Sequence, residues 1–143
     1  MQPTIRPIED RDIEIVVALW DAAGVSRPWN DPVWEIAFAR SGPHSTVLVA
    51  EAAGSVVATA MIGEDGHRGW IYYLAASPDR HGQGLGRAMM EAAEAWLAGR
   101  GVRRINLLIR NENAAVQGFY THLGYRDTDT VCFQKVLDPG KPE

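Results

Sequence analysis

Residues 70–97 contain the stretch that decides the fold, and they read WIYYLAASPDRHGQGLGRAMMEAAEAWL. The first seven residues form an apolar run that is typical of a strand, and a turn rich in glycine follows it. Apolar side chains then recur on one face from Leu85 to Leu97, which predicts an amphipathic helix. The sequence therefore predicts a strand, a glycine-rich turn and a helix in succession.

The glycines of this turn, Gly82, Gly84 and Gly86, stand at alternate positions where the helix begins. Without Cβ atoms, the backbone can curl so that successive N–H groups point at one spot. The N-terminus of the helix adds unpaired N–H groups and a partial positive charge. Together these features predict a site for a pyrophosphate, and a glycine-rich turn without a ligand is the alternative. A P-loop does not fit, because Arg87 and Ala88 follow the last glycine.

Strands and helices alternate through the rest of the chain. Apolar patterning predicts strands at 4–8, 46–52, 55–62, 70–76, 105–109 and 130–137, and helices that end near Gly24, Arg40, Gly101 and Gly124. Cys132 lies in the last strand pattern, where packing is favoured over a nucleophilic role. This order predicts a mixed α/β (α+β) fold with one sheet flanked by helices, and 143 residues suit a single domain over 1–143.

Composition and charge exclude several classes of protein. The formal net charge of −4 is a poor basis for nucleic-acid binding, and no apolar run approaches the ~20 residues that span a bilayer. The single cysteine allows no internal disulfide, the acidic residues among the first 20 do not suit a signal peptide, and both favour a cytoplasmic location. The four histidines show no metal-ligand spacing. Residues 1–65 carry ten acids against four arginines, so this half is acidic.

Two segments resemble the GNAT superfamily of N-acetyltransferases. Leu74–Pro78 leading to Gly82–Gly86 resembles the acetyl-CoA loop of that family, and Asn113–Tyr125 resembles its later asparagine–tyrosine–glycine–aromatic segment. The two segments occur in the expected order, and the resemblance covers essentially the whole chain. Residues 26–32, 65–69 and 72–73 are further similar to the bacterial YpeA-type branch.

The resemblance implies a GNAT-like acyl-CoA acyltransferase fold, in which one mostly antiparallel sheet has a splayed strand pair and helices on both faces. It implies direct transfer of acetyl from acetyl-CoA to an amine, with the pyrophosphate on the glycine loop and the pantetheine arm beside the strand. The residues implied to bind the cofactor are Leu74, Ala75, Ala76, His81, Gly82, Gln83, Gly84, Leu85, Gly86, Arg87, Asn113 and Tyr120. Tyr120 is also implied to be catalytic, with its phenol at the sulfur. His81 departs from the arginine or glutamine usual there, although an imidazole can still hydrogen-bond phosphate, and whether it makes cofactor affinity sensitive to pH stays open.

The acceptor side is implied less specifically. Trp29, Asn30 and Asp31 fall in the segment that usually lines the acceptor pocket, although Trp29 could equally fill the core. Tyr73 is a catalytic candidate, and packing against the sheet is an equal alternative. The general base is open among Tyr73 and four neighbours, which are Glu64, Asp65, His67 and Tyr72.

The sequence thus predicts an acetyl-CoA-dependent N-acetyltransferase, and a catalytically silent acyl-CoA-binding sensor is the alternative. The acidic half predicts a cationic acceptor, either a small molecule or a protein amine. We expect no metal, no nucleic acid and no membrane partner. Edge strands in such folds often pair between subunits, so a homodimer is also allowed.

Overall fold

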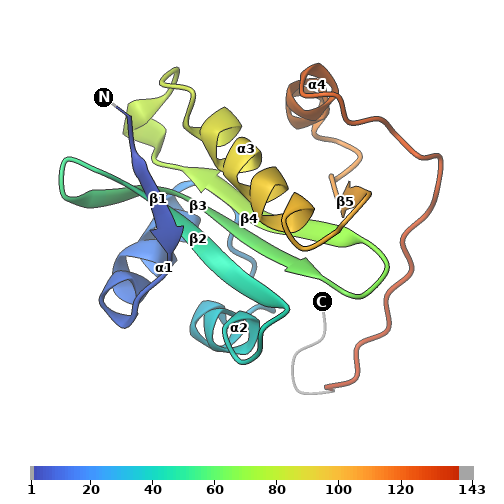
Figure 1. Cartoon of the computed structure of the whole chain (residues 1–143), viewed down its shortest axis with the longest axis horizontal. Coiled ribbons are helices and arrows are strands. Elements are labelled where there is room, and N and C mark those ends of the chain that lie inside the picture. The colour runs from blue at the N-terminus through green and yellow to red at the C-terminus, as the bar shows by residue number, and fades with distance from the viewer. Residues whose placement is uncertain (1, 139–143) are drawn as a thin grey trace. The chain divides into compact units, whose positions relative to one another are not determined.

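The computed structural model describes residues 2–138 of the chain (Figure 1). The chain divides into two compact units, a sheet unit (Met1–Leu107) and a C-terminal unit (Leu108–Glu143). The single domain over 1–143 stays a prediction. Among the helices of residues 2–138, none is both long and apolar enough to cross a membrane.

One five-stranded sheet organises the sheet unit, with the strands in chain order. The strands are β1 (Thr4–Pro7), β2 (Ser45–Ala52), β3 (Ser55–Glu64), β4 (Gly69–Ala76) and β5 (Ile105–Leu107). Valine-rich runs on either side of the turn at Gly54 form the β2–β3 hairpin, which confirms the strands predicted at 46–52 and 55–62. The first three pairings are antiparallel and only β4–β5 is parallel, which confirms a mostly antiparallel sheet.

Strand β4 has two irregularities that shape the site. Its ladder with β5 covers only Gly69–Ile71, although β4 itself runs on to Ala76, so the pair is splayed as expected. On the other side, Met61 pairs with Tyr72 and Thr59 with Ala75, so two residues of β4 lie opposite one residue of β3. This is a β-bulge, and it places Tyr73 at a positive φ of 51°.

Helices cover both faces of the sheet, as Figure 1 shows. Helices α1 (Ile13–Ala22) and α2 (Pro32–Ala39) lie on one face, and α3 (Leu85–Ala98) lies on the other. Because side chains alternate along a strand, Val47 and Val49 pack with Trp20 of α1 in one buried cluster. Leu48 and Ala50, which alternate with these valines and are also buried, face the side of α3.

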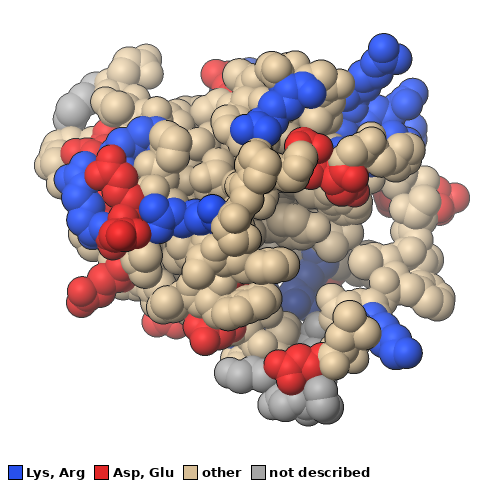
Figure 2. All heavy atoms as spheres, turned by 60° about the horizontal axis from the view of Figure 1, so that its bottom comes forward, with Lys and Arg blue, Asp and Glu red and all other residues tan. Residues whose placement is uncertain are grey.

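An ion-pair network joins β1 to the start of α1 and to β2. The Arg6 guanidinium donates to Asp12 at 2.7 Å and to Glu51 at 2.8 Å. These bonds raise the pKa of Arg6 and lower the pKa of Asp12. Figure 2 shows the mixed basic and acidic side chains at one side of the molecule. The network fixes the first turn of the helical layer to the edge of the sheet.

The C-terminal unit contains α4 (Ala114–His122), which confirms the predicted helix there. The predicted strand at 130–137 is wrong, because these residues form no strand and are exposed. Cys132 is exposed as well, not packed in a sheet. Alternating apolar residues set which face of a strand is buried, but a strand also needs a neighbour to complete its hydrogen bonds, and no ladder includes these residues.

Candidate functional site

The N-terminus of α3 is the centre of the candidate cofactor site. Gly82 and Gly84 have positive φ angles of 83° and 73°, and Gly84 is the N-cap residue. Among residues 2–138, no side chain caps this end, and the first bond of the helix runs from the N–H of Ala88 to the carbonyl of Gly84. A Cβ added at either glycine would meet no atom of the described part of the chain within 4 Å, so it would project into open space beside the loop. The preceding N–H groups of the first turn are therefore left for an outside acceptor.

This donor set fits a phosphate group. Backbone N–H groups at a helix start, with no side-chain oxygen competing for them, form an anion site with a partial positive charge. The predicted residues Leu85, Gly86 and Arg87 form this first turn. The Arg87 side chain also bonds Glu91 at 3.3 Å along the exposed face of the helix.

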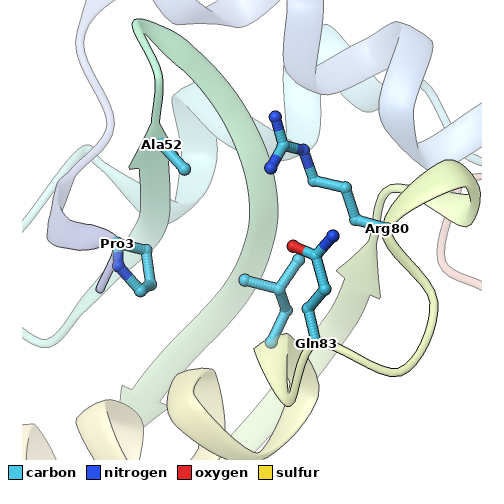
Figure 3. Close-up of a pocket in the computed structure, with 5 residues that line it drawn as sticks. Pro3, Ala52, Arg80 and Gln83 are labelled. Atoms are coloured by element: carbon cyan, nitrogen blue, oxygen red, sulfur yellow. The ribbon is translucent and has the colours of Figure 1, made fainter. Parts of the chain in front are cut away.

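A recess of about 290 Å³ lies beside the same loop. Figure 3 shows Arg80 and Gln83 on the loop, facing Pro3 and Ala52 across the recess, and Leu85 completes the lining. Gln83 and Leu85 were predicted to bind the cofactor, whereas Arg80 was not. The sequence feature that could have indicated Arg80 is the excess of arginine over residues 80–110, where six arginines stand against two acidic residues. Arg80 supplies a permanent positive charge next to His81, which is exposed.

Leu74, Ala75 and Ala76 lead directly into this loop as the end of β4. They lie beyond the point where the β4–β5 ladder stops, at Ile71. The strand therefore continues without β5 along the stretch that the resemblance assigns to the pantetheine arm.

The bulge in β4 builds a second polar centre, around Tyr73. Its ring stacks on Trp20, with centroids 3.9 Å apart and planes at 8°. A buried relay holds the bulge, since the Trp20 indole donates to Thr59 at 2.8 Å and the Thr59 hydroxyl donates to the Tyr73 carbonyl at 2.9 Å. The phenol donates to the Glu35 carboxylate at 2.9 Å, and Asn30 donates to the phenol oxygen at 3.3 Å.

This environment decides what the phenol can do. Burial and the bond to Glu35 raise the pKa of Tyr73 well above its ordinary value. The phenol therefore stays protonated near neutral pH, so it can donate a hydrogen bond but is a poor base. Glu35 is the carboxylate of this centre, and the sequence reasoning missed it. The one sequence feature that could have indicated Glu35 is its position in the first turn of α2. Acidic residues are common there because they interact favourably with the helix dipole, so the position alone does not indicate a functional site.

The predicted acceptor residues are only partly brought together. Asn30 joins Tyr73 and Glu35, and Trp29 is half-buried in the same connection between α1 and α2. Asp31 instead caps α2, accepting the N–H groups of Val33 at 3.1 Å and Trp34 at 3.2 Å.

The other base candidates lie at or near the β3–β4 turn, except Tyr72, which lies within β4. Glu64 pairs with His44 at 2.6 Å, which lowers the pKa of Glu64. Asp65 accepts the N–H groups of His67 and Arg68, and these bonds lower its pKa. Both carboxylates thus fold the turn. Tyr72 stacks with Trp70, with centroids 6.3 Å apart.

Two predicted residues belong to the C-terminal unit. The Asn113 side chain caps α4 by accepting the N–H of Val116 at 3.3 Å. Tyr120 makes edge contacts with Phe119 and Tyr125, and burial raises the pKa of Tyr120 to about 12. It is therefore protonated near neutral pH, as a proton donor must be. The roles of Asn113 and Tyr120 stay predictions.

Comparisons with known proteins identify similar chains. The sequence profile described as "Acetyltransferase (GNAT) family" matches residues 13–125. "Acetyltransferase YE1169" of Yersinia enterocolitica is 39% identical over 133 residues, which is 93% of this chain and 94% of that protein. The solved Escherichia coli ribosomal-protein-S18-alanine N-acetyltransferase is 28% identical, with a TM-score of 0.73 over 85% of this chain and 76% of that one. AAC(6')-Iy, solved with a CoA-linked bisubstrate analogue, has a TM-score of 0.81 at 16% identity, over 95% and 99% of the two chains.

Proposed function

The chain belongs to the acetyltransferase (GNAT) family, and we propose that it transfers the acetyl group of acetyl-CoA directly to an amine acceptor that carries positive charge. Membership of the family makes it an acetyl-CoA-dependent N-acetyltransferase. What we propose beyond family membership is the chemical class of the acceptor, the residues that form the site and the role of each. The similarity to the YpeA-type branch stays a prediction.

The uncapped start of α3 is the observation that carries the cofactor half of the proposal. The backbone at Gly82 and Gly84 holds the pyrophosphate, and Arg80 and Gln83 stand beside it. The β4 backbone at Leu74–Ala76 pairs with the pantetheine arm in place of β5. When bound, acetyl-CoA supplies the activated acetyl thioester.

The Glu35–Tyr73 pair supports the acceptor half. Glu35 is half-buried, and one oxygen of its carboxylate accepts a hydrogen bond from the phenol of Tyr73 at 2.9 Å. Tyr73 and Asn30 fix the direction of this carboxylate, and a half-buried carboxylate attracts a cation more strongly than an exposed one does. The surplus of acids over residues 1–65 adds a field of the same sign. We assign Glu35 to the ammonium group of the acceptor and Tyr73 to holding Glu35.

Thiol release across a panel of amines tests the activity. We expect turnover with acetyl-CoA, and kcat/KM higher for cationic amines than for neutral or acidic ones, with the preference weakened by added salt. Cofactor binding without turnover on any amine would favour the acyl-CoA sensor instead. A salt-independent preference for acidic amines would overturn the charge of the acceptor.

The variant Glu35→Gln tests the acceptor site separately. It keeps the shape and the bond from Tyr73 but removes the charge, so we expect KM for a cationic amine to rise about tenfold. The KM for acetyl-CoA should stay unchanged. The matched variant Glu14→Gln removes one charge from the exposed face of α1, and it should leave both constants unchanged.

A further inference from the structure

A second recess lies at the far end of α3 from the glycine loop. It has a volume of about 250 Å³ and opens between the β3–β4 turn and the connection from α3 to β5. Its charged lining consists of Arg68, Arg100, Arg103, Arg104, His67 and Glu64. The 14 residues of α3 span about 20 Å, so this arginine recess is separate from the cofactor loop.

The charges of the arginine recess are out of balance. Four arginines line it, and Glu64 is the one residue of the lining that carries a carboxylate. This carboxylate is already engaged, because one oxygen pairs with His44 at 2.6 Å and the other accepts the N–H of Gly66 at 3.1 Å. Within residues 2–138, none of the four arginines forms an ion pair. Crowded like charges repel one another, and an anion placed among them relieves that repulsion.

Contacts within the sheet unit hold the walls of the recess in place. The Arg100 guanidinium lies 3.7 Å from the centre of the Trp96 ring and donates to the Pro43 carbonyl at 2.7 Å. Arg68 stands in the turn that Asp65 closes, and it donates to the His67 carbonyl at 3.2 Å. Less side-chain freedom is therefore lost when a ligand binds.

We infer that the arginine recess binds the diphosphate group of a small phosphorylated molecule other than the acetyl donor on the α3 loop. Planar guanidinium groups bind the oxygens of phosphates and carboxylates in pairs. A diphosphate gathers several negative charges within a few bonds, so it suits a small recess lined by several arginines. The volume is below the roughly 300–1,000 Å³ of whole-ligand pockets, so it suits one or two phosphate groups.

The position of the recess gives binding a structural effect. Arg68 directly precedes β4, and Arg103 and Arg104 directly precede β5. The N–H of Gly69 already bonds the Arg104 carbonyl at 2.9 Å. An anion held by these arginines therefore ties the two strands together where their ladder begins, and it raises the melting temperature of the chain.

Calorimetric titration of pyrophosphate into the full chain tests this site. The protein is first saturated with CoA, so that the α3 loop is filled. We expect saturable binding at an ionic strength of about 0.05 M that weakens with added salt. Citrate, a carboxylate polyanion, should bind at least about fivefold more weakly because its negative charges are spread over a larger molecule than those of pyrophosphate. Equal binding of the two anions, or no saturable binding of pyrophosphate, overturns the proposal.

Variants locate the site. The double variant Arg68→Gln with Arg103→Gln should weaken pyrophosphate binding at least about tenfold and abolish the rise in melting temperature. Arg126→Gln removes a charge from the C-terminal unit and should leave the affinity within about twofold. Unchanged CoA binding shows that the double variant is folded. Pyrophosphate affinity equal to that of the original chain in this folded variant would place the anion elsewhere and overturn the assignment.

Discussion

The N-cap residue of helix α2 is Asp31, whose side chain bonds the helix, whereas the N-cap residue of α3 is Gly84, which has no side chain. Asp31 accepts two N–H groups of its own helix, and Pro32 removes a third donor from that end. The start of α3 has neither device, and its glycines adopt the left-handed conformation that opens the loop. The start of α2 is therefore a closed end, because the chain itself bonds its N–H groups. The start of α3 is an open end, whose N–H groups are left for an external anion. The contrast separates a residue that serves stability from one that serves binding.

The largest effect is expected at the open end. The variant Gly84→Val places a branched side chain where the phosphate approaches, so the Kd for CoA should rise about a hundredfold by calorimetry. Strain at the positive φ should also lower the free energy of unfolding by about 1–3 kcal/mol.

Gly54→Val is the matched control for that strain. Gly54 has a φ of 77°, and an added Cβ there also meets no atom within 4 Å, but it stands in the β2–β3 turn. We expect a similar loss of stability with unchanged CoA affinity. Equal CoA affinity in folded Gly84→Val would remove the contrast between the two helix ends.

Tyr120→Phe separates binding from chemistry. The variant removes one oxygen and keeps the ring that packs on Phe119 and Tyr125. If the phenol assists departure of the thiolate, kcat should fall at least about tenfold, or about 1.4 kcal/mol, with CoA affinity and melting temperature unchanged. An unchanged kcat, with chemistry shown to limit the rate, would make Tyr120 a packing residue only.

Asn113 sharpens the comparison, because it caps α4 and is also a predicted cofactor contact. Asn113→Asp keeps a capping oxygen but loses the amide donor and adds negative charge. We therefore expect CoA affinity to fall about fivefold at unchanged melting temperature. Asn113→Ala should lose both affinity and stability. Full CoA affinity in both variants would reduce Asn113 to a cap.

The smallest effect is expected at the closed end. Asp31→Ala should lower the free energy of unfolding by about 1 kcal/mol, measured by denaturant titration, and leave CoA affinity unchanged. Asp31→Ser restores a capping oxygen and should recover most of the stability. A higher KM for the acceptor in both variants would show that Asp31 also contacts the acceptor, as its position in the sequence predicts.

Local signals explain which features were predictable from sequence. The helix that ends near Arg40, the glycine-rich turn before α3 and the two strands on either side of Gly54 each depend on neighbouring residues, and all three are confirmed. The bond between Tyr73 and Glu35 joins residues 38 positions apart through a bulge, and no local pattern encodes it. The strand expected at 130–137 failed for the same reason, since pairing depends on a distant partner.

The early end of the β4–β5 ladder affects the tendency of the protein to self-associate in solution. Beyond Ile71, β4 has the character of a sheet edge inside the sheet, and such edges recruit strands from other molecules. A cofactor arm lying along Leu74–Ala76 acts as the missing strand, so its presence blocks that self-association. We therefore expect concentrated samples without CoA to form light-scattering aggregates that samples with CoA do not form. The acetyl donor would then serve as a solubility factor for its own enzyme.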